Sequence, residues 1–185
     1  LTHDTMEALA ADVLQKAPPE FAIAGLSMGG ILAMEVLRQA PGRVMGLALM
    51  DTNPLAEQPH IAAKRIPQMA AALDGRLESV MRDEMKPNYL TDGPHRARIL
   101  DLCMAMALDL GPDVFVSQSR ALRDRRDQTD TLKAFKKPTL VLCGREDALC
   151  PVSRHELMHG LMPHSTLTII ENAGHLPTLE QPYAT

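Results

Sequence analysis

The chain has 185 residues, of which 45% are hydrophobic, and this length and composition fit one domain with a substantial core. Its formal net charge of −4 excludes the basic field that nucleic-acid binding requires. No segment approaches the roughly 18 consecutive apolar residues of a membrane span. Three cysteines without metal-ligand spacing favour a reducing compartment, so we expect a cytoplasmic protein with no nucleic-acid partner and no membrane span.

The first quarter of the chain alternates between helical and strand patterns. Apolar residues within 6–14 recur at helical spacing and predict an amphipathic helix. Two apolar runs, residues 21–24 and 44–50, predict buried strands on either side of a helix over residues 31–39. This strand, helix, strand order implies a parallel sheet, and ligands of such sheets bind beyond the carboxyl ends of the strands.

A glycine-rich turn joins the first predicted strand to the helix that follows. Its sequence, Gly25-Leu26-Ser27-Met28-Gly29, places a serine at the apex of a strand–turn–helix unit, where a strained backbone exposes a nucleophile above the sheet. We expect side chains at Gly25 or Gly29 to collide with the neighbouring strand and helix. The first N–H groups of the helix lack partners, so the Met28 N–H is a candidate oxyanion donor.

Two later strands end in loops that carry an acid and a histidine. The run at residues 139–143 leads into Asp147, and the run at residues 167–170 leads into His175; the two runs are joined by a predicted helix near Ser153 to Leu161. Loops at the carboxyl ends of parallel strands meet at one edge of a sheet, so both side chains are candidates to join Ser27. Asp51 also follows a predicted strand and is the one alternative acid.

The order Ser27, Asp147, His175 resembles that of the α/β-hydrolase superfamily. The patterns G-x-x-D-x-x-x-P and A-G-H-x-x-x-x-E-x-P around the acid and the histidine match as well, and the chain is most similar to the small capped esterases, lactonases and enol-lactonases. The resemblance runs from Asp4 to Pro182. It implies an α/β fold with a mostly parallel sheet flanked by helices, a Ser27–His175–Asp147 catalytic triad, and neither a metal nor an organic cofactor.

Strand patterns are missing between residues 53 and 134, where three to five helices are predicted, with Gly75 and Gly111 among the breaks. The resemblance identifies this segment as a helical cap inserted into a core formed by residues 1–52 and 135–185. It also implies strands before the first one found here, and these would supply the second oxyanion donor. We therefore expect a fragment of a longer protein, with an unpaired edge at the first strand.

These residues predict a serine hydrolase that cleaves a small-molecule carboxylic ester, lactone or thioester through an acyl-enzyme. C–C hydrolases, perhydrolases and slow hydrolase-like receptors use similar triads and are the alternatives. The cap methionines form either an acyl pocket or ordinary core: Met69, Met81, Met85, Met104 and Met106. Four arginines interleaved with acids form either a solvated helix face or a contact for a substrate carboxylate: Arg120, Arg123, Arg125 and Arg126.

Overall fold

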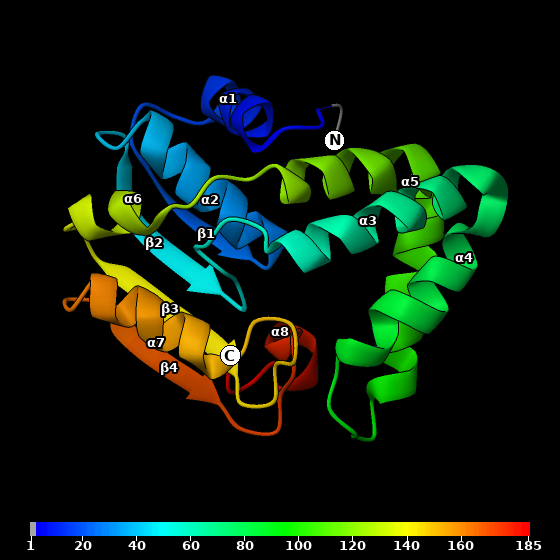
Figure 1. The fold of residues 1–185 in the computed structure, drawn as a ribbon. Coiled ribbons are helices and arrows are strands. Elements are labelled where there is room, and N and C mark those ends of the chain that lie inside the picture. The colour runs from blue at the N-terminus through cyan, green and yellow to red at the C-terminus, as the bar shows by residue number, and fades with distance from the viewer. Residues whose placement is uncertain (1–2) are drawn as a thin grey trace.

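The computed structural model describes residues 3–185, and its centre is a four-stranded parallel sheet (Figure 1). The strands lie in the order β1 (Phe21–Leu26), β2 (Val44–Met50), β3 (Thr139–Gly144) and β4 (Thr166–Ile170). Neighbouring strands are parallel throughout, as predicted, because each connection crosses over through a helix. Within the part of the chain that the structure describes, β1 is an edge strand, which agrees with the expectation.

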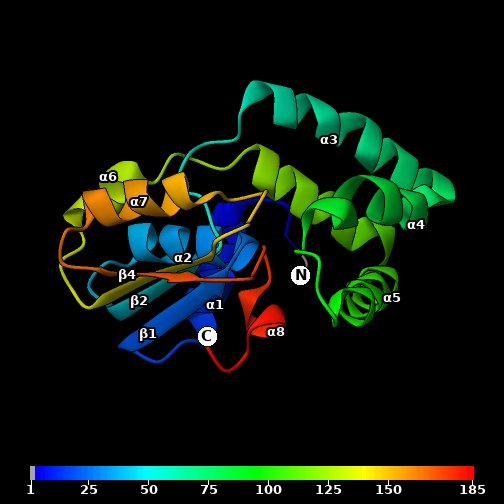
Figure 2. The ribbon, with the colours of Figure 1, turned by 90° about the horizontal axis from the view of Figure 1, so that it is seen from below.

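Helices cover one face of this sheet, as Figure 2 shows. They are α2 (Met28–Gln39), α6 (Thr129–Ala134) and α7 (Val152–Leu161), and α1 (Met6–Lys16) packs against α2. The core lies between the helices and the sheet, where Met34, Leu49 and Met158 are fully buried. Burying a side chain of this size contributes about 1.5–3 kcal/mol to the free energy of folding. This packing stabilises the sheet whose edge carries the site.

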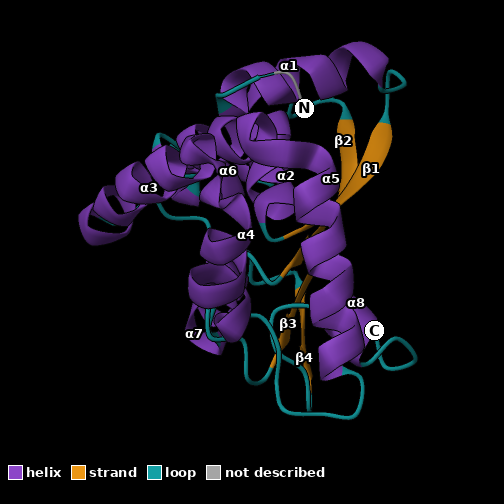
Figure 3. Ribbon diagram, turned by 90° about the vertical axis from the view of Figure 1, so that its right-hand side faces the viewer, coloured by secondary structure: helices purple, strands orange, loops and turns teal. Residues whose placement is uncertain are grey.

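The remaining helices lie beyond the carboxyl ends of the strands (Figures 1 and 3). They are α3 (Pro59–Ala71), α4 (Leu77–Ser79) and α5 (Arg96–Arg123), with single turns η1 (Ala72–Arg76), η2 (Val80–Met85) and η3 (Lys86–Asn88). The predicted breaks at Gly75 and Gly111 are confirmed, since their φ values of 79° and 78° interrupt the helices in a conformation that glycine adopts freely.

This second group of helices has a small apolar cluster of its own, formed by Ala72, Leu77 and Met81 and separate from the core over the sheet. The helix α6 belongs to the segment expected as an insertion, yet it packs against α2 and α7. No helix in residues 3–185 is both long and apolar enough to cross a membrane. A short final helix, α8 (Pro177–Glu180), lies beside the strand ends (Figure 1).

Candidate active site

Ser27 occupies a strained turn between β1 and α2. Its φ of 54° and ψ of −118° lie outside the regions that residues with a side chain normally adopt. Two hydrogen bonds hold this conformation: the Ser27 N–H donates to the Met50 carbonyl at 2.9 Å, and the Thr52 hydroxyl donates to the Ser27 carbonyl at 2.7 Å. The turn is therefore fixed from the neighbouring strand, and strain of this kind is concentrated at functional sites.

The glycines of the turn have different roles from those predicted. A Cβ atom at Gly25 would overlap the Gly29 carbonyl, so the expectation for Gly25 is confirmed. The expectation for Gly29 is wrong, because a Cβ atom there would meet nothing within 4 Å. The close approach belongs instead to Gly30, where a Cβ atom would lie 2.6 Å from the Thr52 hydroxyl. The close contact between α2 and the loop after β2 is therefore made at Gly30, one residue after the glycine that the motif suggested.

Three side chains from separate loops meet beside this turn. His175 Nε2 lies 2.7 Å from Ser27 Oγ, and His175 Nδ1 lies 2.9 Å from Asp147 Oδ2. The other carboxylate oxygen of Asp147 accepts hydrogen bonds from the N–H groups of Leu149 and Cys150 at 2.8 and 2.9 Å. Burial acts to raise the pKa of Asp147, but His175 and these N–H groups outweigh it and hold the pKa below its ordinary value.

The alternative acid, Asp51, is fully buried but hydrogen-bonded elsewhere. Its Oδ1 accepts from the Gly144 N–H at 2.9 Å, and its Oδ2 has no partner among the described residues. Burial, together with the nearby charge of Asp147, raises the pKa of Asp51 to about 8 despite the Gly144 hydrogen bond. The folded protein therefore favours the neutral form of Asp51 more than water does. The structure brings Asp147, and not Asp51, to His175.

The loop that carries His175 is held by residues that the sequence analysis did not assign. Glu180 Oε2 accepts from the N–H groups of Gly174 and Leu176 at 2.9 and 3.2 Å, while the His175 N–H donates to the Tyr89 carbonyl at 2.7 Å. Glu180 Oε1 accepts from the N–H and hydroxyl of Thr91 at 2.9 and 3.1 Å. Glu180 is the glutamate of the A-G-H-x-x-x-x-E pattern, so the sequence held a signal for its role. No sequence signal pointed to the segment 89–91.

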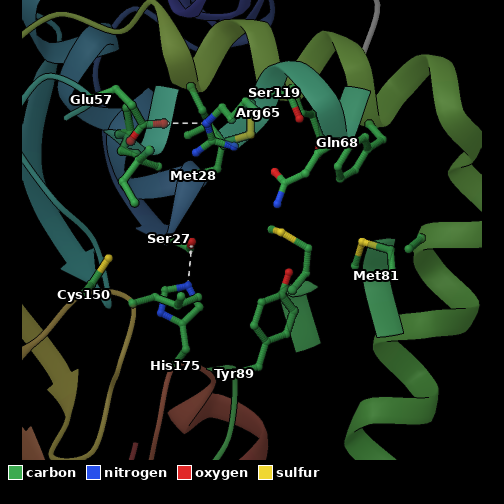
Figure 4. A pocket seen from close by; sticks show the side chains of 18 of the residues that line it. Ser27, Met28, Glu57, Arg65, Gln68, Met81, Tyr89, Ser119, Cys150 and His175 are labelled. Atoms are coloured by element: carbon green, nitrogen blue, oxygen red, sulfur yellow. Dashed lines mark hydrogen bonds and ion pairs between the residues drawn. The ribbon is translucent and has the colours of Figure 1, made fainter. Parts of the chain in front are cut away.

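A cavity of about 710 Å³ opens over Ser27 and His175 (Figure 4). Three of the five singled-out methionines line it, namely Met81, Met85 and Met106, whereas Met104 packs into the apolar cluster of α4 and η2. Met69 is buried and does not line the cavity. Tyr89 lies beside His175, with ring centroids 6.1 Å apart, and burial raises the pKa of its hydroxyl to about 12. The cavity thus combines a flexible apolar wall with a hydroxyl that stays neutral.

The four singled-out arginines separate into two groups. Three pair with acids on the surface: Arg120 with Asp4 at 3.5 Å, Arg123 with Asp124 at 2.6 Å, and Arg126 with Glu7 at 2.8 Å. The prediction of a solvated face is therefore correct for these three arginines. It is wrong for Arg125, whose side chain is only 6% exposed, lines the cavity, and pairs with Glu57 at 2.7 Å. Sequence spacing gave no sign that the chain turns this one arginine inward.

A metal would have to compete with the hydrogen bonds of the site. Asp147, Cys150 and His175 bring three ligand atoms within 4.8 Å of one another. Both carboxylate oxygens of Asp147 and both ring nitrogens of His175 are already hydrogen-bonded to protein groups. Burial also raises the pKa of the Cys150 thiol, which disfavours the thiolate that a metal binds. These groups fit a proton-transfer chain better than a metal centre.

Comparison with known proteins agrees with this geometry. The model of the Alpha/beta hydrolase family matches residues 1–185. A pimeloyl-[acyl-carrier protein] methyl ester esterase from Hamiltonella defensa is 27% identical over 94% of this chain and 69% of its own length. The structure of a thermophilic esterase from Thermogutta terrifontis is 31% identical, with a TM-score of 0.83 over 97% of this chain and 68% of that one.

An enol-lactonase from Burkholderia xenovorans shares the fold, with a TM-score of 0.80 at 21% identity over 97% of this chain and 69% of that one. The chain belongs to the α/β-hydrolase family. The resemblance drawn from the sequence, the expected fold and the expectation of an α/β-hydrolase enzyme are confirmed.

Proposed function

We propose that the protein is a serine esterase whose triad is Ser27, His175 and Asp147. The observation that carries this proposal is the pair of hydrogen bonds, 2.7 and 2.9 Å long, that link the three side chains, of which Ser27 and His175 line the cavity. Ser27 Oγ attacks the ester carbonyl while His175 Nε2 takes its proton, and the imidazolium returns that proton to the leaving alcohol. Asp147 orients the ring and stabilises its positive charge.

Water completes the cycle by attacking the acyl-enzyme, with His175 again acting as the base. The tetrahedral oxyanion of each step is stabilised by the Met28 N–H, since α2 begins at this residue and its first N–H groups have no partner within the helix. Asp51 supports the site indirectly, because its raised pKa disfavours a second negative charge beside Asp147.

The proposed substrates are small carboxylic esters, lactones or thioesters. Esterase relatives support this class, as does the mostly apolar wall over Ser27. We assign residues 53–134 as the cap that closes the cavity and sets substrate choice, because this segment, with α3 and α5 in it, supplies most of the residues that line the cavity. The unpaired state of all three cysteines fits the proposed cytoplasmic location.

A serine-directed fluorophosphonate tests the assignment. It is expected to label the wild-type protein at Ser27 and to leave Ser27→Ala unlabelled, and short p-nitrophenyl esters are expected to turn over many times. Undiminished labelling of Ser27→Ala would remove Ser27 as the nucleophile. A single slow turnover that leaves a retained adduct would favour a hydrolase-like receptor instead.

A further inference from the structure

The charge of the cavity is opposite to that of the whole chain. The chain carries a formal net charge of −4, yet the described residues that line the cavity include four cationic side chains and one carboxylate. The cations are Lys64, Arg65, Arg125 and Arg154, and the carboxylate is Glu57. A concave wall of low dielectric constant focuses such a field, and charges there are screened less than on the surface. The cavity is therefore suited to an anionic group.

Two of these arginines share a single buried carboxylate. The Glu57 side chain is 5% exposed, and it pairs with Arg65 through one oxygen and with Arg125 through the other. Arg125 is also hydrogen-bonded to the carbonyls of Leu55 and Leu122, both at 3.0 Å. The group of three carries a net charge of +1. Since burying a charge without a counter-charge is costly, this arrangement favours a second anion.

Arg65 is the more exposed arginine of this group and has more free donors for that anion. It bonds to Glu57 through Nε, and neither terminal Nη atom has an acceptor among residues 3–185. Its side chain is 14% exposed, and it lines the cavity. Figure 4 shows Arg65 on the same side of the cavity as Gln68 and Ser119, with Ser27 and His175 below them. Ser119 is 3% exposed and adds a hydroxyl donor to this wall.

We propose that Arg65 binds a carboxylate at the far end of the substrate, so that the preferred substrates are esters of dicarboxylic acids with one acid group left free. The proposal rests on the esterase function given above. A planar guanidinium matches a carboxylate through two parallel hydrogen bonds, which a neutral chain end cannot form. The apolar side chains of Met81 and Met85 line the cavity that the methylene chain of such a substrate occupies.

A comparison of monomethyl and dimethyl esters of succinic, adipic and suberic acid tests this. For the chain length that spans the cavity, the wild-type protein is expected to prefer the monoester by about tenfold or more in kcat/KM, because a hydrogen bond to a charged group contributes at least this much. Arg65→Gln should bring that ratio close to one, mainly through a higher KM for the monoester. A contact far from the reacting carbon stabilises the ground state and the transition state equally, so its loss raises KM and leaves kcat almost unchanged. Arg65→Lys should restore part of the preference.

The matched control is Arg98→Gln, which removes the same charge from an exposed arginine on α5 outside the cavity and should leave the preference intact. No preference in the wild-type protein, or equal losses on both esters in Arg65→Gln, would overturn the proposal and make Arg65 a structural partner of Glu57.

Calorimetry with adipate on Ser27→Ala tests the anion site without turnover. At least tenfold weaker binding in Ser27→Ala/Arg65→Gln is expected even if no ester is cleaved, and equal affinities would overturn the site.

Discussion

The loops at the strand ends and the helices above them are built differently. At the strand ends, every N–H from Gly174 to Leu176 has a hydrogen-bond acceptor, and Asp147 and His175 are almost completely buried. Above them, α3 and α5 leave large apolar side chains such as Ile66 and Met106 more than half exposed, and Gly111 divides α5. The proposed catalytic groups need fixed geometry, whereas the proposed acyl-binding wall needs adaptable packing.

The two regions are joined at the histidine loop. Segment 89–91, between η3 and α5, supplies the Tyr89 carbonyl to His175 and the Thr91 donors to Glu180. A Cβ atom at Gly174 would lie 2.9 Å from the Tyr89 carbonyl, so the two segments are as close as a glycine permits. The position of the histidine therefore depends on the helical region as well as on the sheet.

The sharpest test of the strand-end region compares two acids that lie side by side. Asp147→Asn should lower kcat by up to about 10⁴-fold, because an amide holds the imidazole in the wrong tautomer. Asp51→Asn should cost far less, since Asp51 does not contact His175, its raised pKa favours the neutral form, and asparagine also offers an oxygen to the Gly144 N–H. Steady-state kinetics on one p-nitrophenyl ester measures both. If Asp51→Asn lost more, Asp51 would be the working acid.

The connection between the regions is tested by Glu180→Gln. Glutamine keeps one of the two acceptor oxygens, so we expect the loop of His175 to loosen and kcat to fall by about 10–100-fold, as small misplacements of catalytic groups do. The control is Glu171→Gln, which removes a charge from the same loop but breaks only an exposed ion pair with Arg145. Thermal melting of both variants separates the effects: a lower Tm with unchanged kcat would make Glu180 structural only.

Much of the strand-end region was predictable because its signals are local. A strand, a glycine turn and a helix fix where Ser27 lies, and the loops after two apolar runs place Asp147 and His175 at the same edge. The helical region was predictable only in outline. Its breaks at Gly75 and Gly111 are local, but the inward turn of Arg125 and its pairing with Glu57 depend on a contact between two non-helical segments far apart in sequence. The 89–91 segment was missed for the same reason, and two of its three hydrogen bonds to His175 and Glu180 come from its backbone.

The smallest expected effect, and the most direct test of the helical region, comes from two neighbouring methionines. Met106 lines the cavity, while Met104 packs against the cluster of Ala72, Leu77 and Met81. Met106→Ala should change the preference between short and medium acyl chains by about tenfold, because each methylene in an apolar pocket contributes about 1–3 kcal/mol.

Met104→Ala should lower the Tm and leave that preference unchanged, because it removes packing within the cluster without changing the wall of the cavity. Rates for p-nitrophenyl acetate through octanoate, measured beside the melting curves, separate the two outcomes. If both variants lost activity equally at every chain length, the methionines would act as one packed unit. The preference for substrate length would then depend on other residues of the cavity wall. The contrast between rigid loops at the strand ends and adaptable helices above them would no longer hold.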